Sequence, residues 1–339
     1  MKKIFTTRVR LILAAALCVL IVFFPVVVQD QYVVRLGTLV LMYSALALSL
    51  NLITGFMGQV SLGHAAFFGV GAYTSAILSD RFEWPFLLTA FCAILVAACF
   101  GMLLGIPALK LSGSYLSIVT LGFCEIIRLV ELNWIDLTRG PMGMTGIARP
   151  VIFGIKIKSG MSYYYLCLII LMIVTFVVMN MMHSHIGRAI MSVREDSIAA
   201  SAMGVNVFRY KVMTFTISSG FAGLVGAFYA HYMRFIDPNA FNFEQSTSVL
   251  SMVILGGLGS IPGSFLGALL LSVIPELLRD LAEARMLIYG LVLVLMMMFR
   301  PKGILGTTAI PQLLGIEKKY AVPDSLEKQT AGVGGNSHE

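Results

Sequence analysis

Charged residues are scarce in this sequence of 339 residues. Asp, Glu, Lys and Arg make up 12% of the chain, whereas apolar residues (AVILMFWYC) make up 58%, and the mean hydropathy is +0.89. A soluble domain carries about 25% charged residues, so the charges here are too few to cover a water-soluble globule. The composition also excludes disordered, collagen-like and disulfide-scaffold chains. The class that remains is a polytopic membrane protein.

The sequence also lacks the motifs of metal, enzymatic and nucleotide chemistry. None of the five cysteines forms a Cys-x-x-Cys pair, and free thiols in apolar stretches usually pack as small hydrophobes. His183 and His185 have a metal-binding spacing but no third ligand nearby, so we predict no metal site. No phosphate-loop motif and no Ser-His-Asp order is present. We therefore expect no enzyme activity and no ATP hydrolysis by this chain alone.

The net charge of +7 indicates membrane topology rather than nucleic-acid binding. No basic stripe interleaves with aromatic residues, as a single-strand binding surface requires, so we predict no nucleic-acid partner. Basic residues of membrane proteins gather in cytoplasmic loops. The basic segment 1–10 precedes an apolar run that is longer than a signal-peptide core and lacks a cleavage site. We expect a retained first span with residues 1–10 in the cytoplasm.

Long stretches without Asp, Glu, Lys or Arg predict transmembrane helices. A span needs about 20 apolar residues, and continuous apolar runs favour helices over barrel strands. The predicted fold is all-α, a polytopic helical bundle with about nine or ten full or half crossings over residues 11–300. The stretches are 11–29, 36–79, 86–109, 159–187, 212–233, 245–275 and 286–299, together with 111–130, which is apolar except for Glu125 and Arg128.

Glycine-rich breaks interrupt two of these stretches. The stretch 36–79 breaks at 55–59 into spans at about 36–54 and 60–79, and 245–275 breaks at 256–263, where it could be re-entrant. Paired glycine-interrupted segments point to a transport site and to an internal repeat. Alternatively, the glycines only permit close helix packing. The break residues are Gly55, Gly58, Gly256, Gly257, Gly259 and Gly263.

The charged loops set the expected topology. The loop 183–211 and the tail 301–339 are basic near the membrane, so we place both in the cytoplasm, with the tail partly disordered. This arrangement requires 245–275 to cross twice. The loop 131–161 then lies on the periplasmic side. Its four basic residues, Arg139, Arg149, Lys156 and Lys158, conflict with that placement.

The loop 183–211 is the most informative segment of the chain. We predict two short amphipathic helices in it, separated at Gly204, with the charged cluster Arg194-Glu195-Asp196 between two spans. A helical segment of this kind could dock in a groove of a cytoplasmic partner and transmit rigid-body motion. A plain surface helix would give the same amphipathic pattern.

The core Ala199-Ala200-x-x-x-Gly204 of this loop resembles the EAA loop of bacterial ABC importer permeases. More specifically, the chain resembles the permease subunits of the branched-chain (hydrophobic) amino acid family, LivM type, over residues 36–306. Ile198 stands where the general pattern opens with Glu, and the loop after Gly140 lacks an acidic residue expected beside its second glycine. The resembling stretches are 51–69, 120–128, 140–147, 255–260 and 299–303, besides the loop itself.

The resemblance implies a permease subunit in the bacterial inner membrane that moves branched-chain amino acids by alternating access. Its partners would be two ATP-binding cassette ATPase subunits, a second homologous permease subunit and a periplasmic substrate-binding protein, with ATP and Mg bound by the ATPases only. Urea or a short amide is an alternative cargo; an ion-coupled transporter or a structural membrane protein is an alternative class. The expected coupling residues are Gly187, Arg188, Arg194, Glu195, Asp196, Ala199, Ala200 and Gly204.

The few polar residues inside the apolar stretches are candidates for the translocation path. Glu125 and Arg128 share one helix face, and charges inside a membrane are costly and often functional. The pair could instead lie at the outer end of its span. His64 could instead bond a neighbouring helix only. The path candidates are Asn51, Ser61, Gly63, His64 and Glu125.

Overall fold

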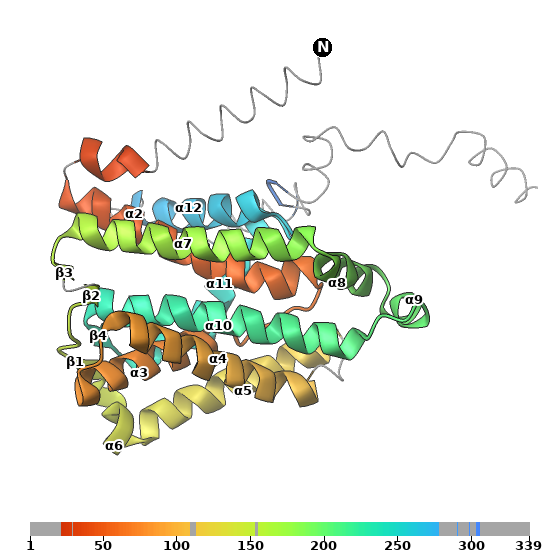
Figure 1. The fold of residues 1–339 in the computed structure, drawn as a ribbon, viewed down its shortest axis with the longest axis horizontal. Coiled ribbons are helices and arrows are strands. Elements are labelled where there is room, and N and C mark those ends of the chain that lie inside the picture. The colour runs from red at the N-terminus through yellow and green to blue at the C-terminus, as the bar shows by residue number, and fades with distance from the viewer. Residues whose placement is uncertain are drawn as a thin grey trace, which may run out of the picture.

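The structure, a computed structural model, describes residues 22–28, 30–108, 113–152, 155–277, 290, 298 and 303–305. Within these residues the chain is a bundle of helices (Figure 1). Several predicted segments lie wholly or largely outside the described residues. They are the N-terminal segment 1–10, most of the span 11–29, nearly all of 286–299 and nearly all of the tail 301–339.

The helices follow the predicted stretches. The first half contains α2 (Gln31–Asn51), the π-helix η1 (Leu52–Phe56), α3 (His64–Phe82), α4 (Phe86–Ala108) and α5 (Ser114–Asn133). A connection with α6 (Ile135–Thr138), η2 (Gly140–Met142), β1 (Met144–Thr145), β2 (Val151–Ile152) and β3 (Ile155–Lys156) leads to α7 (Gly160–His183). Then follow α8 (His185–Glu195), α9 (Ser197–Ala202), α10 (Val207–Met233), β4 (Phe235–Ile236), η3 (Pro238–Phe241), α11 (Phe243–Gly256) and α12 (Ile261–Leu277). Among the described residues, four helices are long and apolar enough to cross a membrane: Gln31–Phe56, Phe86–Pro107, Gly160–His183 and Val207–Met233.

Some boundaries differ from the prediction. The helix after the first break begins at His64, not near residue 60, so the break extends over 57–63. The helices α5 and α7 extend into the predicted outer loop, which shortens it to 134–159. The helix α10 begins at Val207, so the coupling loop ends at residue 206. The all-α prediction is confirmed, because each described strand is only two residues long.

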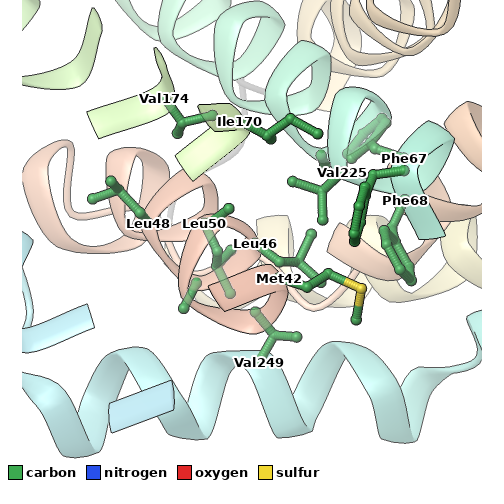
Figure 2. Close-up of a cluster of buried hydrophobic side chains, with 14 of the residues drawn as sticks. Met42, Leu46, Leu48, Leu50, Phe67, Phe68, Ile170, Val174, Val225 and Val249 are labelled. Atoms are coloured by element: carbon green, nitrogen blue, oxygen red, sulfur yellow. The ribbon is translucent and has the colours of Figure 1, made fainter. Parts of the chain in front are cut away.

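The core lies around α2 and α10. Helix α2 packs against α7, α10, α11 and α12, and α10 packs against α3 and α4 as well. In lipid, such contacts depend on close packing because hydrocarbon is as apolar as the side chains. Figure 2 shows part of this core, where apolar side chains from five helices meet: Met42, Leu46, Leu48, Leu50, Phe67, Phe68, Ile170, Val174, Val225 and Val249.

The two ends of the bundle are built differently. The helices α8 and α9 lie at one end, whereas α6 and the four strands lie at the opposite end (Figure 1). At the strand end, β1 pairs with β4 in antiparallel register and so joins the connection after α5 to the one after α10. Arg139, one of the four basic residues of the outer loop, forms an ion pair with Asp80 there at 2.9 Å. The predicted coupling loop and the predicted outer loop are therefore at opposite ends.

The segment 245–275 folds back on itself as a helical hairpin. Helix α11 ends at Gly256, residues 257–260 turn, and α12 returns along α11. The backbones meet so closely at Gly256 that a Cβ there would lie 2.0 Å from the carbonyl oxygen of Gly263. The interpretation of these glycines as close-packing residues is confirmed here. The last carbonyls of α11 accept hydrogen bonds from the amides of Ile304 and Leu305, both at 2.9 Å, so the tail starts beside this turn.

Candidate functional site

The two predicted helix breaks meet through Asn51, the last residue of α2. Its side chain is fully buried. Its Nδ2 donates to the carbonyl oxygen of Ser260 at 3.0 Å and to Ser264 Oγ at 2.8 Å, and its Oδ1 accepts from the amide of Gly259 at 2.9 Å. Gly55 lies directly beside this contact. The two similar glycine-rich segments are therefore in contact, and Asn51 links the end of α2 to the turn between α11 and α12.

Ser61, Gly63 and His64 lie together where the chain enters α3. His64 Nε2 lies 2.7 Å from Ser49 Oγ, so the interpretation that His64 bonds a neighbouring helix is confirmed. Ser61 Oγ and His64 Nδ1 are buried and have no hydrogen-bond partner among the described residues. Gly63 packs against the backbone of Thr120 in α5. Because buried polar atoms without partners are uncommon, these two atoms mark a place where a further polar group would be stabilised.

Helix α11 begins beside the residues Ser61, Gly63 and His64. The amide of Ala65, in the first turn of α3, donates to Ser246 Oγ in the first turn of α11 at 3.0 Å. The N-termini of α3 and α11 are therefore neighbours. Each N-terminus carries a partial positive charge, so both helices favour an anionic group such as a carboxylate at this position.

The loop 57–63 joins this polar group to α5 and to α8. Ser117 Oγ donates to the carbonyl oxygen of Val60 at 3.0 Å, and the amide of Leu62 donates to Thr120 Oγ1 at 3.0 Å. At the other end of the loop, Gly58 has φ +74°, and a Cβ on it would lie 3.0 Å from Cγ of Arg194 in α8. The loop thus contacts the coupling segment at one end and the start of α3 at the other.

Helix α8 lies on the end of the bundle with one face buried. Gly187, Ile190 and Val193 form this face, three residues apart as an amphipathic helix requires. Ser184 begins the helix by accepting a hydrogen bond from the amide of Ile186 at 3.1 Å. The predicted amphipathic character of this segment is confirmed.

The predicted separation of the two coupling helices at Gly204 is wrong. They separate at Asp196, whose carboxylate accepts from the amides of Ile198 at 2.8 Å and Ala199 at 3.0 Å and so begins α9. An aspartate at this position satisfies amides that have no partner within the helix. Gly204, with φ +85°, follows the end of α9 instead.

The tip formed by α9 is apolar and exposed. Ile198 is 82% exposed and Met203 is 84% exposed, and α9 projects beyond the bundle (Figure 1). Two large exposed apolar side chains on a projecting segment make this tip a candidate for a protein contact. The sequence marked Ile198 only as a departure from a motif, and it did not single out Met203. Of the predicted coupling residues, Gly187 and Ala200 are buried, Arg194 is half-buried, and Arg188, Glu195, Asp196, Ala199 and Gly204 are exposed.

Glu125 is the path candidate on α5, where it pairs with Arg128. Arg128 Nε donates to Glu125 Oε2 at 2.9 Å, so the predicted pair on one helix face is confirmed. Helix α5 extends over Ser114–Asn133, which places Glu125 near its middle. This position disagrees with the alternative of a pair at the outer end of the span.

Residues 32–299 match the model of the family described as branched-chain amino acid transport system / permease component. The chain belongs to this family. It is 38% identical to the high-affinity branched-chain amino acid transport system permease protein LivM of Escherichia coli, over 91% of this chain and 77% of that protein. It is 25% identical to LivH of Salmonella typhimurium over 80% of this chain and 93% of that protein. It is 25% identical to BraD of Pseudomonas aeruginosa over 80% of this chain and 94% of that protein. No solved structure matches it.

Membership of this permease family identifies the chain as a multi-pass membrane component of a transporter and not as an enzyme. Escherichia coli has both a LivM and a LivH permease protein with the same system name, and the permease described here is similar to both. It is thus one subunit of a multi-subunit ABC transporter with a second permease.

Proposed function

We propose that this permease carries branched-chain amino acids across the bacterial inner membrane as one membrane subunit of an ATP-driven importer. The names of the relatives LivM, LivH and BraD supply the cargo class. The end of the bundle with α8 and α9 faces the cytoplasm together with both termini. The end with the connection 134–159 faces the periplasm, where a substrate-binding protein delivers the cargo.

One observation carries the coupling part of this proposal, namely the exposed apolar tip on α9. Ile198 and Met203 would insert into a groove on a partner ATPase, and the exposed charges of Arg188 and Glu195 would pair at its rim. Two ATPase subunits would bind ATP and Mg, and each would contact one permease at its cytoplasmic end. Buried apolar anchors with polar rims supply most of the affinity in such interfaces.

Motion of the ATPases would then reach the path through Arg194. This side chain lies against Gly58, and the loop that begins there ends at Ser61, Gly63 and His64. The unpartnered atoms of Ser61 and His64, at the paired N-termini of α3 and α11, would bind the carboxylate of the amino acid. Of the other path candidates, Asn51 has both polar atoms of its amide bonded within the chain and Glu125 is paired with Arg128 on α5, so we assign neither of them to the binding of cargo. Shifting the loop 57–63 would open and close this region, which is alternating access.

The test is a double substitution at the α9 tip, Ile198→Asp with Met203→Asp, in the complex purified from membranes and reconstituted with ATP. We expect the ATPase subunits to be lost from the complex and leucine uptake to fall at least roughly tenfold, because two apolar anchors are removed. Met142→Asp is the control for ATPase binding, since Met142 is 85% exposed but belongs to η2, between α6 and β1, which lie at the opposite end of the bundle. Retention of both ATPase binding and uptake in the double variant would contradict the docking role.

The same reconstituted system separates the alternatives. Uptake that vanadate blocks and ionophores spare supports ATP-driven import. Uptake that ionophores abolish and vanadate spares would indicate ion-coupled transport instead. Competition by urea or a short amide, with none by leucine, would reassign the cargo and leave the coupling mechanism in place.

A further inference from the structure

The outward face of α5 differs from the outward faces of α4 and α7. All three helices expose large apolar side chains. Helices α4 and α7 contain no Asp, Glu, Lys or Arg, as expected of surfaces that face lipid. Helix α5 packs mainly against α3, η3 and α4 on one side, lies at the edge of the bundle (Figure 1), and carries Glu125 and Arg128 in its middle.

Among the described residues, the charged pair has only a part of the partners that it could bind. The ion pair joins Glu125 Oε2 to Arg128 Nε, and the side chains remain 35% and 24% exposed. The guanidinium of Arg128 also donates a long hydrogen bond to Asn239 Oδ1 at 3.4 Å. The sequence predicts that the segment of α5 lies within the membrane. Hydrocarbon supplies no hydrogen-bond partner, so charges in the middle of such a helix would face protein or a water-filled space.

Gly122, one turn before Glu125 on α5, leaves part of the helix surface without a covering side chain. Ile118, Gly122 and Ile126 are four residues apart and so lie along one face. Ile118 is 64% exposed and Ile126 is 60% exposed. A Cβ built on Gly122 meets no atom within 4 Å. A glycine flanked by branched apolar residues on an open helix face lets another helix approach closely.

We propose that this α5 face, formed by Ile118, Gly122, Glu125 and Ile126 with Arg128 at its edge, is the contact surface for the second, non-identical permease subunit. A soluble partner cannot reach the middle of a span, and lipid cannot satisfy the ion pair. A transmembrane helix of the other permease meets both requirements when it places a small residue against Gly122 and polar groups against the pair. The inference depends on the proposed function only in requiring a transporter with two permeases.

The first test is photo-crosslinking in the complete transporter in native membranes. A benzophenone amino acid replaces Ile118 or Ile126 on α5. The controls are Leu103 on α4 and Phe176 on α7, each 67% exposed. We expect both α5 positions to give an adduct with a different branched-chain amino acid permease, identified by its peptides, at least roughly fivefold above the controls. An adduct with a second copy of this chain, or no protein adduct at either α5 position, would overturn the proposal.

The second test is Gly122→Leu, which this chain can accommodate because the space around Gly122 is open. We expect the chain to keep its thermal stability while the second permease is lost from the purified complex. Cys99→Leu is the matched control, because Cys99 is exposed on α4. If the complex purified with Gly122→Leu contained the two permeases in an unchanged ratio, the proposed contact surface would be wrong. Neither readout needs cargo or ATP, so a failure of the uptake experiment leaves this test intact.

Discussion

At the scale of single residues, Asn51 is the clearest case of a polar side chain with a structural role. A path residue would keep polar atoms free for cargo, whereas both polar atoms of the Asn51 amide are bonded within the chain. Ser61 and His64 retain unpartnered atoms. The two kinds of residue can be separated by comparing stability with uptake.

Asn51→Leu tests this distinction. The substitution keeps a similar volume but leaves the buried amide of Gly259 without its acceptor, which costs about 1–3 kcal/mol. We expect the melting temperature of the purified chain to fall by several degrees. The control is Asn133→Leu, because Asn133 is exposed and bonds only within its own helix. If Asn51→Leu lost uptake and yet melted like the control, a path role for Asn51 would be favoured instead.

The sequence could single out Asn51, Ser61 and His64, because a polar residue in an apolar stretch is conspicuous. It could not name their partners. Ser260 lies 209 positions from Asn51, and contacts over such separations depend on how helices pack rather than on local pattern. The exposed apolar tip was missed for a related reason. Ile198 and Met203 are ordinary residues in a membrane protein until the structure places them outside the bundle.

At the scale of helices, the sequence predicted where apolar stretches break but not always which residue begins the next helix. Asp196 and Gly204 are both residue types found at helix boundaries. Asp196 begins a helix by accepting hydrogen bonds from its free amides, and Gly204 follows the end of a helix with positive φ. Choosing between them requires the path of the backbone. In contrast, the presence of both breaks was predicted correctly, because clustered glycines weaken a helix in stretches that are too long for one span. Their bounds differ, since the helices stop over 57–63 and 257–260 rather than over 55–59 and 256–263.

The hairpin of α11 and α12 depends on the absence of side chains where the two helices meet. In Gly256→Leu the new Cβ would meet the backbone of Gly263 at 2.0 Å, and backbone cannot rotate away as a side chain can. We expect the helices to separate at a cost of more than about 3 kcal/mol, seen as loss of folded protein after detergent extraction. Gly122→Leu is the matched substitution at an open glycine and should extract normally. Equal yields of the two variants would contradict the close packing.

At the scale of the whole molecule, composition alone was enough to predict a helical membrane bundle, because lipid permits few other architectures for this chain. Which helices are central was not predictable. Helices α2 and α10 lie at the centre because small residues of α10 approach α3 and α4, and periodicity is weak in helices that are apolar all round. The orientation in the membrane still rests on the distribution of basic residues.

Orientation can be tested with two exposed apolar side chains, Met142 in η2 shortly before β1 and Met203 directly after α9. Figure 1 shows β1 and α9 at opposite ends of the bundle. Each is replaced by cysteine in cells that lack the partner ATPases, so that the α9 tip is not covered. Intact spheroplasts and inverted vesicles are treated with a membrane-impermeant maleimide, with the unsubstituted chain as background. We expect Met142→Cys to react in spheroplasts and Met203→Cys only in inverted vesicles, because the coupling end faces the ATPases. The reverse pattern would invert the proposed topology. Labelling of both positions from one side would contradict their placement on opposite faces of the membrane.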